Sequence, residues 1–157
     1  MAKKRRLGIV IDASIARGAG VKNDRRSRTC RQFLRWVFRY CHHLVLSNEI
    51  ETEWHRHQSR FTLRWLKTMA DRDKIDRKGA LNQDALRNRI AALPIKLQCR
   101  RAMAKDAALI VAAQVGDRVI VSLDNKARDL FNRHAETLRT PKGILWRNPE
   151  EDNIPWT

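Results

Sequence analysis

The fold is decided by the stretch RVIVSLDNKARDLFNRHAETL, residues 118–138. It opens with a short apolar run rich in β-branched side chains, Arg118–Leu123, which is typical of a buried strand. The strand ends at Asp124, and helical patterning returns at Asn125–Leu138. The stretch therefore predicts a strand, an acidic residue at its end and a helix, in immediate succession.

A strand that ends at an acid is also expected near the N-terminus, at LGIVID, residues 7–12. Leu7–Ile11 is again short, apolar and β-branched, and the strand that it predicts ends at Asp12. Two more short apolar runs predict strands at HLVLS, His43–Ser47, and at GILW, Gly143–Trp146.

Helical patterns fill most of the chain between these strands. Apolar residues at helical spacing, with arginines on or near the other side, predict an amphipathic helix from about Arg26 to Tyr40. Ser47 is an expected N-cap for a helix that starts near Asn48 and continues, with or without a break, to about Ala70. Further helices are expected at 81–93 and 100–115, and polar loops at 17–27 and 71–80.

Alternating strands and helices are typical of a mostly parallel sheet with helices on both faces. We therefore expect an α/β fold, a three-layer α/β/α sandwich with a mostly parallel central sheet. The chain has 157 residues, of which 43% are apolar, so it can bury one hydrophobic core. We expect a single domain, 1–157, with its core at about residues 7–147, a basic N-terminal tip and a polar C-terminal tail.

The charge balance indicates a polyanionic partner. There are 33 Lys and Arg against 17 Asp and Glu, a net charge of +16. A charge this large costs self-repulsion, which a polyanion relieves, and the arginine fork suits phosphate. Nucleic acid is therefore expected as the partner, ahead of an anionic membrane. A solvated helix face is the alternative for any one basic stripe. The candidate nucleic-acid-binding residues on the two predicted helices are Arg28, Arg31, Arg35, Arg39, Arg60, Arg64 and Lys67.

Targeting signals and cysteine patterns favour the cytoplasm. There is no run of about 18 or more apolar residues, so no membrane span is expected. The basic MAKKRR is followed by an Asp after only five residues, too soon for a signal peptide. Cys30, Cys41 and Cys99 form no CxxC pair, which argues against a disulfide framework or a zinc ribbon and favours buried, reduced thiols.

Two of the predicted strands end in an acid, Asp12 and Asp124. In an open parallel sheet, sites form beyond the carboxyl ends of the strands, at the switch point in strand order. If the two strands are neighbours across that point, both carboxylates meet at one cleft. The alternative is that each Asp only caps a helix or makes a turn.

Further acids could join this cleft. Asp106 interrupts the apolar stripe of its predicted helix, where a lone buried charge is costly, so either a salt bridge to an arginine or metal ligation is expected. Glu49, Glu51 and Glu53 compete for one further position. The first two lie in or near a first helical turn, where acids favour the dipole anyway, whereas Glu53 lies further in.

Three stretches, LGIVIDAS, LVLSNEIETEW and KDAALIVAAQVGDRVIVSLDNKARDLF, resemble the PIN-domain family over roughly residues 7–147. Ser14 matches a small hydroxyl or amide residue that is often found two positions after the first Asp of the family. Many members carry one more acid just after the fourth-strand Asp, where this chain has Asn125 and Lys126. Asp129, or the side-chain carbonyl of Asn125, is expected to take its place. The family's four acidic positions are matched, in order, by Asp12, Glu53, Asp106 and Asp124.

The resemblance implies a metal-dependent endoribonuclease. Oxygen-only ligands suit Mg²⁺ or Mn²⁺, which would activate a water for attack on an RNA phosphodiester. Asp12 and Asp124 are then the main metal ligands, and Asp106 and Glu53 complete the cage or orient the water. The resemblance also implies a homodimer and, for the toxin half of a toxin–antitoxin pair, a small antitoxin protein as a partner.

A second hypothesis is a non-catalytic RNA-binding module on the same fold. It is motivated by the missing fifth acid and by the high arginine content. Metal-dependent cleavage discriminates the two, because the binding module would retain RNA without cutting it.

Overall fold

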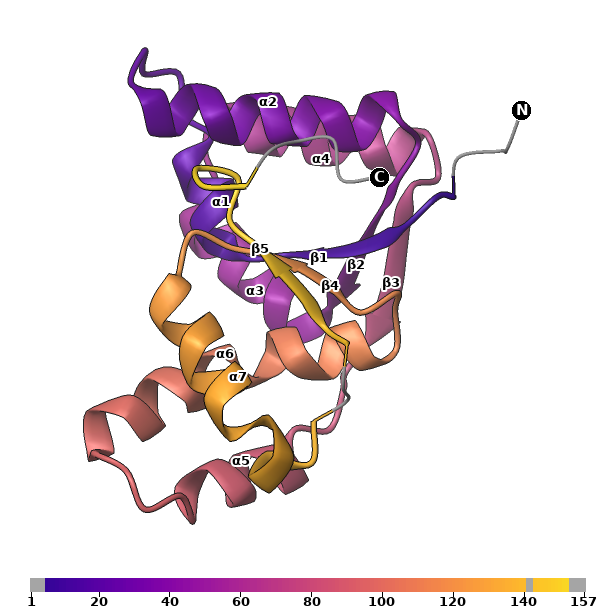
Figure 1. Cartoon of the computed structure of the whole chain (residues 1–157). Helices are drawn as coiled ribbons and strands as arrows, with labels where there is room; N and C mark the ends of the chain where they lie inside the picture. Colours follow the sequence, from indigo (N-terminus) through magenta and orange to yellow (C-terminus); the bar gives the residue numbers. More distant parts are fainter. Residues whose placement is uncertain (1–4, 141–142, 153–157) are drawn as a thin grey trace.

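The computed structural model describes residues 5–140 and 143–152, and Figure 1 gives its arrangement. Residues 1–4 of the expected basic tip and residues 153–157 of the expected polar tail lie outside this described part. One five-stranded sheet runs through the molecule in the order β3-β2-β1-β4-β5, and every strand pair is parallel. The strands are β1 (Gly8–Ile11), β2 (His43–Ser47), β3 (Ile75–Gly79), β4 (Val119–Val121) and β5 (Leu145–Arg147).

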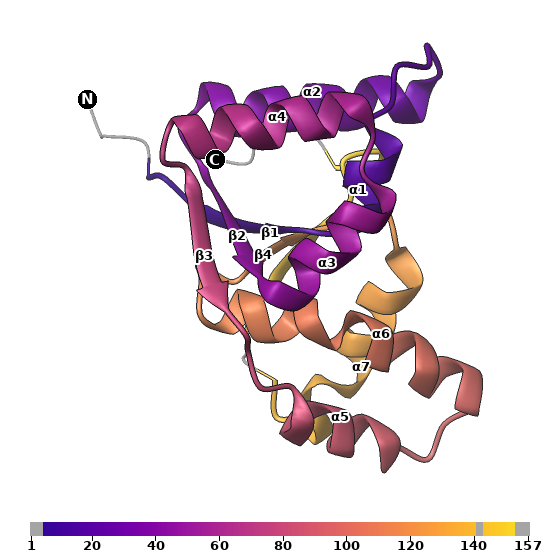
Figure 2. The same ribbon diagram turned by 180° about the vertical axis from the view of Figure 1, so that it is seen from behind.

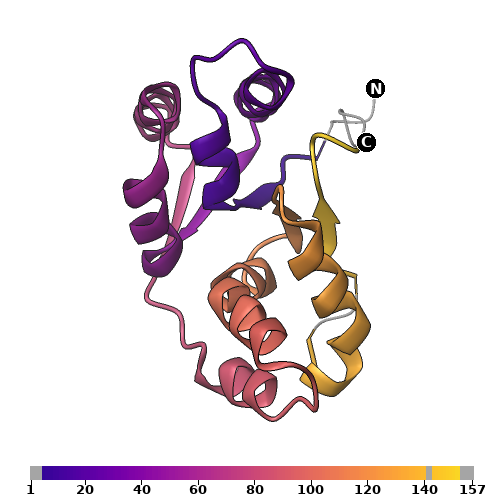
Figure 3. The same ribbon diagram turned by 90° about the vertical axis from the view of Figure 1, so that its left-hand side faces the viewer.

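Helices cover both faces of the sheet, as Figure 3 shows along its edge. Helices α2 and α4 lie over one face, and α6 and α7 lie over the other with α5 beyond them. This division follows from right-handed crossovers, because the chain moves along the sheet in one direction from β1 to β3 and in the other from β4 to β5. The helices are α1 (Ala13–Gly18), α2 (Arg25–Arg39), α3 (Asn48–His57), α4 (Arg60–Asp71), α5 (Asp84–Ala91), α6 (Leu97–Gln114) and α7 (Asn125–Leu138).

The predicted α/β class with a central parallel sheet is confirmed. The two central strands, β1 and β4, carry apolar side chains throughout, as expected for strands that helices bury from both sides. Ile9, Val10 and Ile11 of β1 have no exposed surface, and β4 beside them is buried throughout. The register of the two strands sets Ile9 opposite Val119 and Ile11 opposite Val121. Their carboxyl ends therefore finish at the same level.

One predicted loop is wrong. Residues 71–80 were expected to be a polar loop, but Ile75–Gly79 forms β3 at the edge of the sheet, beside β2. An edge strand is paired on one side only and tolerates charged side chains, so the sequence IDRKG lacks the apolar signature of an inner strand.

Smaller differences concern helix boundaries. Helix α1 was not predicted, because its buried residues Ala13, Ile15 and Ala16 span too short a stretch to show a helical period. The long helix expected from Asn48 to Ala70 is broken at residues 58–59, where the side chain of Ser59 accepts a hydrogen bond from the Thr62 amide and begins α4. Helix α6 begins at Leu97, three residues before the expected start.

The structure also bears on the expected lack of a membrane span and on the state of the cysteines. Over residues 5–140 and 143–152, no helix is long and apolar enough to cross a membrane. All three cysteines are free thiols; Cys30 is buried, and Cys41 and Cys99 are partly exposed. Burial raises the pKa of the Cys30 thiol to about 12, so this thiol is unreactive at neutral pH.

Candidate active site

The strand order places a switch point between β1 and β4, because the chain leaves β1 toward β2 on one side and reaches β4 on the other. Asp12 follows β1 directly, and Asp124 follows β4 by three residues. The backbone amide of Asp12 donates a 2.9 Å hydrogen bond to the carbonyl of Val121, the last residue of β4. The two acid-ending strands are therefore neighbours, as the sequence predicted.

Two serine hydroxyls orient the Asp12 carboxylate. The hydroxyl of Ser14 donates to Oδ2 of Asp12 at 2.7 Å, and the hydroxyl of Ser122 donates to the same oxygen at 2.8 Å. Each serine oxygen also accepts a backbone N–H from the loop after β4, from Leu123 to Ser14 and from Asp124 to Ser122. Within the described residues, Oδ1 of Asp12 has no hydrogen-bond partner, so this oxygen can accept a ligand.

The carboxylate of Asp124 caps a helix, whereas the carboxylate of Asp12 does not. Oδ1 of Asp124 accepts a 3.0 Å hydrogen bond from the Ala127 amide and so caps α7. Asp12 occupies the same position before α1, yet its side chain makes no capping hydrogen bond. Both carboxylates line the same cleft. Capping and cleft lining are therefore compatible at Asp124, and the Asp12 carboxylate faces the cleft without a capping role.

Asp106 reaches this cleft from α6 and is the most perturbed acid in it. Burial, and then the negative charges of Asp12, Asp124 and Glu53, raise the pKa of Asp106 to about 7, against an opposing effect of Lys105. No described arginine or lysine forms an ion pair with Asp106 within 4.0 Å, so the salt-bridge alternative is not observed. The raised pKa reflects first the burial of Asp106 itself and then repulsion from the neighbouring carboxylates.

The three candidate glutamates of α3 differ in their surroundings. Glu53 lines the cleft and pairs with Arg56 at 3.1 Å and His57 at 3.6 Å. Glu51 instead binds Arg77 of the edge strand and does not line the cleft. Glu49 also lines the cleft, and its Oε2 is buried without a hydrogen-bond partner among the described residues. Glu49 and Glu53 therefore both remain candidates, and Glu51 does not.

Helix α3 is held in place at the end of β1. The indole Nε1 of Trp54, which is fully buried, donates a 2.8 Å hydrogen bond to the carbonyl of Ile11. Ile11 is the residue before Asp12, so the contact fixes the α3 acids relative to the acid that follows β1.

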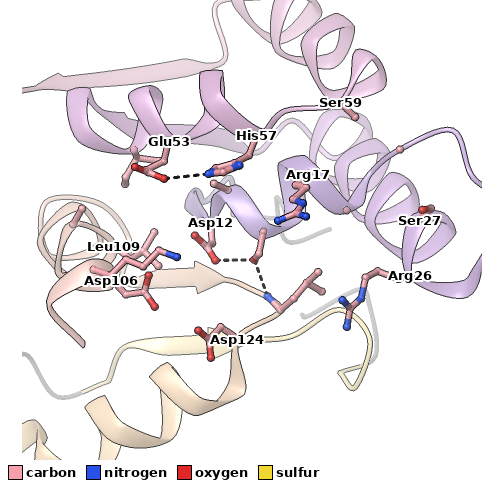
Figure 4. A pocket seen from close by; sticks show the side chains of 18 of the residues that line it. Asp12, Arg17, Arg26, Ser27, Glu53, His57, Ser59, Asp106, Leu109 and Asp124 are labelled. Carbon is pink, nitrogen blue, oxygen red and sulfur yellow. Dashed lines mark hydrogen bonds and ion pairs between the residues drawn. The ribbon is translucent and has the colours of Figure 1, made fainter. Parts of the chain in front are cut away.

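Figure 4 shows the side chains of Asp12, Glu53, Asp106 and Asp124 around one hollow, each from a different segment of the chain. The cleft has a volume of about 1130 Å³, slightly larger than a typical small-molecule pocket, and room for a stretch of polymer. Six basic side chains line it, and all but Arg60 are absent from the candidates predicted from the sequence. These cleft cations are Arg17, Lys22, Arg26, Arg60, Arg87 and Lys105.

Of the seven predicted nucleic-acid-binding residues, only Arg60 lines the cleft. Arg28 and Arg31 fasten the loop before α2, by hydrogen bonds to the Asn23 side chain and to the carbonyls of Gly20 and Lys22. Arg39 lies over the ring of Tyr40 and Lys67 is exposed on α4. Arg35 and Arg64 line a second, smaller groove between α2 and α4.

The three further candidates, Ser14, Asn125 and Asp129, differ in where they lie. Ser14 contacts Asp12 as described, whereas Asp129 is exposed, pairs with Arg128 and does not line the cleft. Asn125 lines the cleft, but its side-chain carbonyl already accepts a 3.0 Å hydrogen bond from the amide of the buried Asn148. Asp129 therefore supplies no fifth ligand to the cleft, and the Asn125 carbonyl oxygen is held by Asn148.

The donor set suits a hydrated hard cation better than a tightly caged one. Over the described parts of the chain, no three His, Cys, Asp or Glu side chains are positioned to hold a metal ion together. Mg²⁺ keeps several waters and is usually bound through one or two carboxylates, so it does not require such a cage. Asp12, Asp106 and Asp124 offer oxygen ligands only, and their mutual repulsion is what a divalent cation relieves.

No family model, no curated protein and no solved structure matches this chain. The resemblance to PIN-domain proteins therefore stays a prediction. The convergence of Asp12, Asp106 and Asp124 does not depend on it, because strand order and the position of α6 bring these acids together.

Proposed function

We propose that the protein is a cytoplasmic, metal-dependent endoribonuclease of the PIN-domain kind. One observation carries the proposal: Asp12, Glu53, Asp106 and Asp124 line one cleft, where burial and the charges of the other three raise the pKa of Asp106 to about 7. A protein gains no stability from carboxylates crowded in this way. Such crowding is therefore expected where a bound cation, and the chemistry that it supports, offsets the cost.

The acids have distinct expected roles. A bound Mg²⁺ or Mn²⁺ would supply charge neutralisation and a water acidic enough to attack a phosphodiester at neutral pH. Asp12, held by two serine hydroxyls, and Asp124, held at the start of α7, would be its main ligands. Asp106 and Glu53 would complete the ligand set or accept a hydrogen bond from the attacking water.

The basic rim supports a polyanionic substrate. Arg17, Lys22 and Arg60 lie around the acids and can bind the phosphates on either side of the one that is cut. A nucleic acid is long enough to contact the carboxylates and the cationic rim at the same time. A small anionic metabolite is not, so the cleft fits a nucleic acid better. RNA, a toxin role with a small antitoxin partner, and a homodimer are predictions that rest on the family resemblance.

A non-catalytic RNA-binding module is the second candidate. Two observations favour it: no three metal-ligating side chains are positioned together over residues 5–140 and 143–152, and Asn125 stands where many family members carry an acid. In that case the acids would only shape the cleft, and the basic rim would hold RNA uncut.

The test is incubation of the purified protein with a mixed pool of end-labelled RNA, in Mn²⁺ or in EDTA, beside the Asp12→Asn variant. Asn keeps the shape of Asp and removes its charge. Cutting that requires metal and is lost in the variant supports the nuclease. Equal cutting by both proteins would refute the assignment of the site, and tight binding without cutting in any metal would favour the binding module.

A further inference from the structure

A second hollow lies between α2 and α4, which run side by side over one face of the sheet (Figure 2). We call it the α2–α4 groove; it is lined by Arg35, Phe38, Phe61, Arg64, Trp65 and Thr68 and has a volume of about 350 Å³. Its floor is aromatic and its sides carry two arginines. The guanidinium of Arg35 lies 5.2 Å from the centre of the Phe61 ring, so a flat cationic group already occupies one face of that ring.

The cations of the groove have no acidic partners. Arg35 and Arg64 are exposed, and neither forms an ion pair with any residue in 5–140 or 143–152. Helix α2 carries no acid at all, and the one acid of α4 is its last residue, Asp71. Phe38 and Phe61 are partly exposed beside these arginines, and Trp65 is buried. Cations together with aromatic rings are the combination that binds single-stranded nucleic acid, cations for the phosphates and rings for the bases.

Basic side chains of α4 lead from the acidic cleft toward the groove. Both helices return from one end of the parallel sheet to the other between adjacent strands, so both begin at the end where Asp12 and Asp124 lie. Arg60, at the start of α4, lines the cleft, and Arg64 lines the groove. Residues four apart are neighbours on one side of a helix, about 6 Å apart along its axis. A line of positive charge therefore leads out of the cleft along α4.

We propose that the α2–α4 groove is a second RNA-binding site, which takes an unpaired nucleotide of the same strand that enters the acidic cleft. Arg35 and Arg64 bind the phosphates that flank the base, and the base packs against the part of Phe61 that Arg35 leaves exposed. Phe38 is not used in this way, because Lys74 already lies over its ring at 4.5 Å. The inference rests on the proposed function for the identity of the strand. It adds that the substrate is single-stranded beyond the cut, because a paired base cannot stack in the groove.

The test measures binding rather than cleavage, in the Asp12→Asn background. Fluorescence anisotropy compares single-stranded RNA of about 16 and about 4 nucleotides, the two ends of the usual range of site sizes. Arg35→Gln combined with Arg64→Gln should weaken binding of the long RNA about tenfold or more and leave the short RNA unaffected. The slope of log affinity against log salt should fall by about 1.4, at about 0.7 for each lost phosphate contact.

A charge-matched control separates the groove from the net charge. Arg101→Gln combined with Arg133→Gln removes two exposed arginines of α6 and α7, on the opposite face of the sheet, and should change the affinity for long RNA much less. Phe61→Leu keeps the charges. It should also weaken binding of the long RNA, and it should leave the slope of log affinity against log salt unchanged.

The outcomes distinguish this proposal from the nuclease. An equal loss of RNA affinity in the groove and control variants would overturn the groove as an RNA site. Unchanged RNA affinity in both variants would also overturn it, and would favour an acidic protein surface as the occupant of the groove. Groove-dependent binding without metal-dependent cleavage would overturn the nuclease and leave the groove in place.

Discussion

The hydroxyl of Ser122 donates a 2.8 Å hydrogen bond to Oδ2 of Asp12, and its oxygen accepts the backbone N–H of Asp124 at 3.0 Å. Ser122 is only 1% exposed, so these contacts are shielded from water. One buried side chain thereby joins the two acids that follow neighbouring strands. The distance between the two carboxylates is thus controlled by a hydrogen-bond relay as well as by the register of β1 and β4.

Ser122→Ala should lower the cleavage rate about tenfold and destabilise the fold by about 1–2 kcal/mol. The variant removes one of two donors to Asp12 and leaves the Asp124 amide without its acceptor. Ser122→Thr, which keeps the hydroxyl, should retain most of the activity. Rates at saturating Mn²⁺ and at limiting Mn²⁺ separate weaker metal binding from a general loss of folded protein, since only the former is rescued by added metal.

Asp106→Asn should stabilise the metal-free protein at pH 8 and abolish cleavage. The folded-state pKa of Asp106 is raised from 3.8 to about 7, so between these pH values the folded protein holds a proton that the unfolded chain has released. The free energy of unfolding therefore falls as the pH rises through this window, and stays low above it. The amide removes the buried charge, and each kcal/mol gained should raise Tm by about 2–4 °C.

Measuring the same variant at a lower pH provides the control. At pH 5, about one pH unit above the ordinary pKa of 3.8, most of the cost of keeping this carboxyl protonated in the folded protein is absent, so the stabilisation should be much smaller than at pH 8. Calorimetry at pH 5 and pH 8, in EDTA, checks this. A gain in Tm that is equal at both pH values would show that Asp106 is not crowded by other charges.

Three isosteric substitutions on α3 test which glutamates serve the site. Glu53→Gln should reduce cleavage at least tenfold, because the Glu53 charge acts directly on Asp106. Glu49→Gln should also reduce cleavage, because Glu49 lines the cleft and its Oε2 has no other partner among the described residues. Glu51→Gln is the matched control on the same helix and should leave cleavage unchanged, since Glu51 pairs with Arg77 outside the cleft. Loss of activity in that control would contradict the placement of α3.

Much of the acidic centre could be predicted because it lies on elements with strong patterns. The inner strands are continuous apolar runs, so the acids that end them, Asp12 and Asp124, stand out. Asp106 stands out because it interrupts an apolar helical stripe. Each of these signals is local in sequence, and the parallel topology brings the signals together.

The rest depends on tertiary contacts that no local pattern encodes. The edge strand β3 has a polar sequence, IDRKG, and is made a strand by pairing with β2. Arg17 and Arg87 belong to different helices, and nothing in their own neighbourhood marks them as parts of one cleft. Ser122 lies two residues before Asp124, and its contact with Asp12 arises only because β1 and β4 are adjacent.

The most direct test of a metal-dependent site in this cleft compares Asp124→Asn with Asp129→Asn. The two acids are five residues apart, but Asp124 lines the cleft and Asp129 is exposed outside it, paired with Arg128. Asn remains a good helix N-cap, so both variants should fold. The measurement is the initial rate of RNA cleavage in Mn²⁺. We expect Asp124→Asn to lose at least two orders of magnitude, a typical loss for a charge acting in the transition state, and Asp129→Asn to match the unaltered protein. Equal rates for the two variants would contradict the site.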